Sequence, residues 1–133
     1  MNRRHFIAAL ALLPYATTFI PAARAGVRLP FDAAAFAEAQ KAGGPILVDI
    51  AADWCPTCRA QKPIVDGLLS LPGNEALLVF EVDFDTQANI VRGFGARSQS
   101  TLIAFRGTKE TGRSVGDTDP TSIAALVRGA TTP

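Results

Sequence analysis

Residues 46–58 have the sequence ILVDIAADWCPTC, in which a predicted strand is followed by a pair of cysteines. The first six residues are almost continuously apolar, which is typical of a strand covered on both faces. One acid, Asp49, lies inside this run. A helical pattern begins at Cys55 and continues past Cys58. The stretch therefore predicts a pair of cysteines where a strand gives way to a helix.

The segments on either side alternate between helical and strand periodicity. Apolar residues at helical spacing predict a helix over residues 30–44, with Asp32 as its N-cap. After the strand, the patterns predict a helix over 55–70 that contains Pro63, a strand over 77–84, a helix over 86–94, strands over 101–105 and 113–116 joined by a turn over 107–112, and a helix over 120–128 capped by Asp119. We therefore expect an α/β fold, with a central mixed sheet of about four strands and helices on both faces.

Composition bounds the possible functions. The chain has 133 residues, 48% of them hydrophobic, which suits one compact domain and excludes a disordered or multidomain chain. The net charge of +1 is too small to gather nucleic acid or anionic lipid by electrostatics alone. We therefore expect no nucleic-acid partner.

Residues 1–25 have the features of a cleavable secretory signal. Arg3 and Arg4 precede an apolar run over residues 6–13, and small residues over 22–25 place a cleavage site after Ala25. The alternative is a membrane-spanning helix, which needs about 20 consecutive apolar residues, whereas Pro14 and Pro21 interrupt this run. We expect an exported, periplasmic bacterial protein with no membrane anchor after cleavage.

The start of this segment also resembles a twin-arginine signal, which would carry the protein across the inner membrane already folded. The matching residues are 2–7, NRRHFI. A general secretory signal can also contain paired arginines, so both routes stay open.

Cleavage after Ala25 would leave a domain, residues 26–133, of 108 residues with ten basic and twelve acidic side chains. This domain has neither His5 nor Met1, the only histidine and methionine of the chain. Imidazole catalysis, histidine-bound zinc or copper and thioether-bound copper are thereby excluded from it. Cys55 and Cys58 remain for redox or nucleophilic chemistry, and we expect no cofactor and no metal.

The spacing of Cys55 and Cys58 favours reversible thiol–disulfide exchange. Two cysteines three residues apart at a helix start can close a small disulfide ring, and the unpaired N–H groups there favour a thiolate at the first cysteine. We expect Cys55 to be the attacking thiol. Cys58, one turn deeper and more buried, is expected to resolve the mixed disulfide.

Three other interpretations of the cysteine pair are a structural disulfide, a metal site and a pair of inert thiols. A structural disulfide is common in secreted proteins, but so short a loop constrains the unfolded chain little. A metal site would need two further ligands, from carboxylates or a second chain. Inert buried thiols fit poorly with Trp54 and Pro56, which place the pair at a surface turn.

The domain after residue 25 resembles the thioredoxin-like family over almost its whole length. Asp49 lies six residues before Cys55, where the family has a buried acid, and Pro63 lies eight residues after it, where the family has a helix-kinking proline. Residues 94–95 and 101–103 and the glycine Gly116 match later family positions.

The resemblance implies that Cys55 is the nucleophile, Cys58 the resolving thiol, and Asp49 a proton acceptor for Cys58 that acts through water. Burial should raise the pKa of Asp49 toward neutrality, which suits a general base. The alternative is a core acid satisfied by backbone donors. We expect the residues around the dithiol that meet protein substrates to be Trp54, Pro56, Thr57, Gln99 and Ser100.

Two positions depart from the family pattern. Ser100 stands where the family has a cis-proline that presents backbone groups to substrate, and we expect a trans or remodelled loop because a cis bond before serine costs about 3 to 4 kcal/mol. Glu81 stands where many members have a lysine. We expect the Asp49–Glu81 pair to hold a proton near neutral pH.

The sequence contains opposing signals for the direction of electron flow. Pro56 resembles the C-P-x-C of periplasmic disulfide oxidases, but the short domain and residues 52–55 resemble periplasmic reductases and membrane electron conduits. We favour a reductase, supplied by an inner-membrane thiol donor. Because Ser100 replaces proline, a non-catalytic binding or thiol-chaperone module is the alternative.

Overall fold

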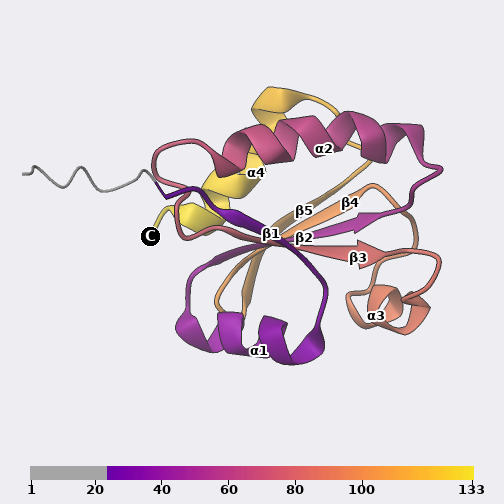
Figure 1. Cartoon of the computed structure of the whole chain (residues 1–133), viewed down its shortest axis with the longest axis horizontal. Helices are drawn as coiled ribbons and strands as arrows, with labels where there is room; N and C mark the ends of the chain where they lie inside the picture. The colour runs from indigo at the N-terminus through magenta and orange to yellow at the C-terminus, as the bar shows by residue number, and fades with distance from the viewer. Residues whose placement is uncertain (1–23) are drawn as a thin grey trace, which may run out of the picture.

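The computed structural model describes residues 24–133 as a five-stranded mixed sheet between two layers of helices (Figure 1). The predicted signal segment lies outside these residues, apart from Arg24 and Ala25. The elements in chain order are β1 (Val27–Pro30), α1 (Ala33–Ala42), β2 (Pro45–Ala51), α2 (Pro56–Leu69), β3 (Leu78–Asp83), α3 (Ala88–Gly93), β4 (Thr101–Arg106), β5 (Lys109–Val115) and α4 (Pro120–Thr131). None of the helices in this part of the chain is long and apolar enough to span a membrane.

The strand order is β1-β3-β2-β4-β5, which places β2 at the centre of the sheet. β2 is parallel to β3 and antiparallel to β4, and β4 and β5 form an antiparallel hairpin. The predicted mixed sheet with a late hairpin is confirmed. Because β2 has a strand on each side and helices on both faces, the residues that follow its carboxyl end, between β2 and α2, start from a fixed position.

The two faces of the sheet carry separate cores. α2 and α4 cover one face, and α1 and α3 cover the other (Figure 1). Leu47 and Leu102 point toward α2 and α4, whereas the second core is built around phenylalanines in edge-to-face contact, namely Phe31, Phe36, Phe80, Phe94 and Phe105. Asp49 is two residues after Leu47 on β2, so its side chain points to the same face of the sheet, toward α2.

The helix starts follow from local capping. The carboxylate of Asp32 accepts a hydrogen bond from the Ala35 backbone N–H (2.8 Å), and that of Asp119 accepts one from the Ser122 N–H (2.9 Å). Both caps satisfy donors that have no partner inside the helix. The two N-caps predicted from the sequence are confirmed.

Two strands differ from the prediction. β1 was missed and is the fifth strand; it is a four-residue edge strand held to β3 by parallel pairing from Val27↔Leu78 to Pro30↔Glu81. β5 begins at Lys109, so the turn over 107–112 is wrong, and two residues, Gly107 and Thr108, connect the hairpin. A register shift near Ala104 and a polar, exposed sequence hide the periodicity of β5.

Candidate active site

Cys55 and Cys58 form a disulfide at the start of α2, beyond the carboxyl end of β2. Their Cα atoms are 5.3 Å apart. Cys55 is the N-cap of α2, in extended backbone conformation, and its Sγ accepts a hydrogen bond from the Cys58 N–H at 3.1 Å. Pro56 occupies the first helical turn, where its missing N–H costs nothing. The helix start therefore offers a hydrogen bond and a positive dipole end to negative charge on the Cys55 sulfur.

Both cysteines are buried in the oxidised site, with 1% of Cys55 and 6% of Cys58 exposed. The expectation that Cys58 is the more buried of the two is wrong for this state, and so is the argument that the pair lies open at a surface turn. As the N-cap, Cys55 turns its side chain over the first turn of α2, where it forms a small buried cluster with Ala52 and Cys58; Phe84 packs against this cluster. The neighbouring side chains of Trp54 and Pro56 are exposed instead.

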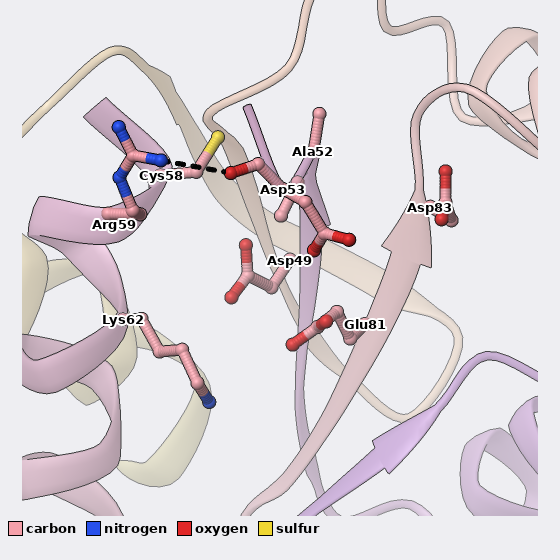
Figure 2. Close-up of a pocket in the computed structure, with 9 residues that line it drawn as sticks. Asp49, Ala52, Asp53, Cys58, Arg59, Lys62, Glu81 and Asp83 are labelled. Carbon is pink, nitrogen blue, oxygen red and sulfur yellow. Dashed lines mark hydrogen bonds between the residues drawn. The ribbon is translucent and has the colours of Figure 1, made fainter. Parts of the chain in front are cut away.

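A cavity of about 220 Å³ reaches the Cys58 side of the disulfide (Figure 2). Charged residues from three elements line it, and its wall includes Asp49, Asp53, Cys58, Arg59, Lys62, Glu81 and Asp83. The Arg59 guanidinium donates to the Asp53 carbonyl at 3.2 Å across its upper rim. The cavity is large and polar enough to hold water. It therefore offers a route for a proton between Cys58 and the Asp49 carboxylate.

Asp49 is 3% exposed and lies beneath Cys58 in this cavity (Figure 2). Burial raises the pKa of the Asp49 carboxyl, a hydrogen bond and the charge of Arg28 oppose that rise, and the negative charge of Glu81 adds a smaller one. A raised pKa brings the carboxyl closer to the working range of a general base. The predicted direction of the shift is confirmed.

The surroundings of Asp49 differ from what the sequence suggested, because Arg28 of β1 lies between the carboxylates of Asp49 and Glu81. Its Nη1 donates to Asp49 Oδ2 at 2.8 Å and to Glu81 Oε2 at 2.9 Å. Asp49 and Glu81 are paired neighbours on β2 and β3, as the family resemblance implied. The hydrogen-bond partner of Asp49 is this side chain rather than backbone donors. Sequence analysis missed Arg28, although it is the one basic residue between the predicted cleavage site and Lys41.

The buried charge of Asp49 gives a prediction for stability. Because the folded-state pKa lies above the unfolded value of about 3.9, the folded chain binds more protons between the two values, and stability falls as pH rises through that window. We expect Asp49→Asn to gain stability relative to wild type from about pH 4 upward, with the difference levelling off above the folded pKa. Urea unfolding of both oxidised proteins across this range measures it. A difference that does not change with pH would contradict the prediction.

The loop at Ser100 has a trans peptide bond, with no cis bond anywhere in residues 24–133. Ser100 has a φ of 56°, in the left-handed region that non-glycine residues rarely adopt. The expectation of a trans or remodelled loop is confirmed in its first form, since the bond is trans. The Ser100 carbonyl accepts hydrogen bonds from the Gly116 N–H (2.9 Å) and from Gln61 Nε2 (3.2 Å), which fix this unusual backbone.

Gln61 ties that loop to the active-site helix. It is fully buried on α2, three residues after Cys58, and its Nε2 also donates to the Asp117 carbonyl at 2.8 Å. Sequence analysis missed it. The available signal was a glutamine on the same helix face as Val65 and Leu68, where an amide needs buried partners.

The remaining predicted substrate residues differ in their exposure to solvent. The side chain of Trp54 is 55% exposed, and its indole Nε1 donates to Asp85 Oδ2 at 2.8 Å. Pro56 is exposed, and Thr57 and Gln99 are partly buried. Within residues 24–133, no three Cys, Asp or Glu side chains are grouped so that they could hold a metal ion.

Comparisons with known proteins agree with this geometry. The family model described as Thioredoxin matches residues 28–129. Thioredoxin of Chlamydia muridarum is 36% identical over 87 residues, covering 65% of this chain and 82% of its own length. Bifunctional thioredoxin reductase/thioredoxin of Mycobacterium leprae is 34% identical over 103 residues, which are 77% of this chain and 22% of that protein. The crystal structure of Trxlp from Edwardsiella tarda has a TM-score of 0.74 at 40% identity and covers 76% of this chain and 98% of its own.

Proposed function

Because the chain belongs to the thioredoxin family, whose members are thiol:disulfide oxidoreductases, we propose that it is an exported reductase of protein disulfides. The observation that supports this most directly is the Cys55–Cys58 disulfide at the start of α2, with Cys55 Sγ accepting the Cys58 N–H. A structural disulfide would not need a helix N-terminus that stabilises the thiolate, nor a polar cavity beneath one of its sulfurs.

The proposed reaction is a two-electron exchange. In the reduced protein, the Cys55 thiolate attacks a substrate disulfide, forming a mixed disulfide and releasing one substrate thiolate. Cys58 loses its proton toward Asp49 through the cavity, and its thiolate attacks Cys55 Sγ. The second substrate thiolate leaves, so the substrate gains two electrons and the protein keeps the Cys55–Cys58 disulfide.

The substrate is proposed to bind at the surface that covers the disulfide. Trp54 and Pro56 are the exposed residues there, and Thr57, Gln99 and Ser100 complete the proposed contact surface. The rigid Ser100 backbone would take over the presenting role of the family's proline bend, because Gln61 and Gly116 hold it.

The oxidoreductase proposal is tested by reduction of insulin with dithiothreitol as the electron source. Wild-type protein is expected to accelerate insulin precipitation well above the uncatalysed rate, and Cys55→Ser is expected to lose that acceleration. Equal rates for the two proteins would favour the alternative, a binding or thiol-chaperone module, which the replacement of the family proline by Ser100 suggests.

The direction of electron flow is tested by the reduction potential. A reductase is expected to lie near the thioredoxin value of about −270 mV, whereas an oxidase lies near about −120 mV. Equilibration of the Cys55–Cys58 pair with glutathione or dithiothreitol buffers measures it. In cells, a reductase supplied by an inner-membrane thiol donor is expected to be largely reduced, and a fully oxidised pair would contradict that donor.

Export rests on residues 1–25 and is proposed from the sequence. The mature protein is expected in the periplasmic fraction with Gly26 at its N-terminus, as found by N-terminal sequencing. Substitution of Arg3 and Arg4 by lysine is expected to block export by the twin-arginine route but not by the general secretory route, which separates the two.

A further inference from the structure

The guanidinium of Arg28 binds several carboxylates next to the dithiol site. Its side chain is 15% exposed and donates to three carboxylates from three elements: Asp49 of β2, Glu81 of β3 and Asp66 of α2. The Nε–Oδ1 distance to Asp66 is 2.8 Å, which equals the distance from Nη1 to Asp49 Oδ2. The guanidinium is thereby held from two sides in a single orientation.

The orientation of the Arg28 guanidinium determines which carboxylate oxygen of Asp49 is left free to face the cavity. Oδ2 of Asp49 is bound to Arg28, and Oδ1 has no hydrogen-bond partner among residues 24–133. Asp49 and Cys58 line the same cavity, and the carboxylate lies between Cys58 and the Lys62 and Glu81 side chains (Figure 2). One oxygen is thus occupied by a fixed cation, and the other is left to take a proton.

Arg28 is also the main positive charge at Asp49. From α2, Lys62 lines the cavity, but its Nζ is bonded to Asp66 at 3.1 Å. From β3, Glu81 contributes a negative charge, and from β4 the paired residue is the apolar Leu102. Without Arg28, the buried Asp49 would lie beside a second carboxylate, Glu81 on the adjacent strand, with no cation at hydrogen-bond distance.

We propose that Arg28 is a positioning residue of the dithiol site, which orients the Asp49 carboxylate and keeps it ionised so that it can accept the Cys58 proton. The role of Asp49 in this inference rests on the proposed function. Arg28 acts through Asp49 and does not touch the sulfurs.

The test is the pH profile of insulin reduction by the purified protein. Because the charge and hydrogen bond of Arg28 both lower the pKa of Asp49, Arg28→Met is expected to move the acid limb of the profile to higher pH, by roughly 1 to 3 units for the loss of one close opposite charge. Arg28→Lys keeps the positive charge, so its acid limb is expected to lie close to that of wild type. An acid limb that stays in place in a folded Arg28→Met protein overturns the proposal.

Matched variants separate this role from a structural one. Asp66→Asn removes the tie between β1 and α2 but leaves the Arg28–Asp49 bond, so its acid limb is expected to stay or move to lower pH. Arg28→Met in an Asp49→Asn background is expected to cause no further shift. An upward shift with Asp66→Asn, or the same shift in the Asp49→Asn background, would assign the effect to the fold or to another group.

Two further measurements keep the proposal testable if Arg28→Met does not fold or the protein is not a reductase. Glu81→Gln removes a negative neighbour that shares Nη1, and its acid limb is expected to move to lower pH; an upward shift contradicts the proposal. Carbon NMR titration of the Asp49 carboxyl in the oxidised protein needs no turnover. A midpoint that Arg28→Met does not raise, or that Glu81→Gln does not lower, with activity present, rejects the positioning role, whereas absent activity rejects the proposed function.

Discussion

Substitution of Cys58 by serine is expected to stop turnover and to trap the protein on its substrate. Cys55 keeps its place as the N-cap of α2 and can still attack, because the Cys58 N–H that bonds its sulfur belongs to the backbone. Serine cannot attack the mixed disulfide, so the second half of the exchange is lost. We expect insulin reduction to fall to the uncatalysed rate, and mixed disulfides through Cys55 to accumulate on non-reducing gels.

The matched control for trapping is Cys55→Ser. It removes the attacking sulfur, so it is expected to lose turnover equally but to form few mixed disulfides. Serine differs from cysteine by one atom, so both variants should fold alike, which circular dichroism can verify. Trapping by Cys55→Ser and not by Cys58→Ser would reverse the assigned roles.

The second large effect is expected on stability, from Phe80→Ala. Phe80 is 1% exposed on β3 and contacts Phe31 and Phe36 edge to face, at ring-centroid distances of 6.2 and 5.5 Å. Truncating such a residue costs about 3 to 5 kcal/mol through lost burial and the cavity left behind. Since small domains are stable by about 5 to 15 kcal/mol, this is a large share of the total. Urea unfolding of the oxidised protein measures the loss.

Leu71→Ala is the control for this substitution. Leu71 is also a large apolar residue, but half of it is exposed, and it lies outside the phenylalanine cluster. Exposed substitutions of this kind change stability by about 0.5 kcal/mol or less. A loss below about 1 kcal/mol for Phe80→Ala would show that the core can close over the cavity.

The disulfide position and the buried acid could be predicted because their signals are local. Asp49 lies inside an unbroken apolar run, so a single strand assignment was enough to bury it. Cys55 precedes a proline and a helical pattern, so a single helix assignment was enough to place it at a helix start. The caps at Asp32 and Asp119 reach only three residues along the chain. Such features depend on neighbours in sequence and require no knowledge of the fold.

The burial order of the cysteines and the extent of β5 could not be obtained in this way. Cys55 belongs to a small buried cluster with Ala52 and Cys58, against which Phe84, from the segment after β3, packs. β5 is polar and exposed, and its strand conformation comes from pairing with β4, whose register shifts at Ala104. Both depend on contacts with chain segments that local periodicity does not report.

By itself, the sequence determined the family, the α/β architecture, the dithiol and the acid next to it, because period, capping and motif spacing are short-range properties of the chain. The tertiary structure alone decided what surrounds that acid. Arg28 is 21 residues from Asp49, 38 from Asp66 and 53 from Glu81, and the three carboxylates meet it only because β1 pairs with β3 beside β2. Charge interactions depend on distance in space, and the parallel pairing of an edge strand sets that distance.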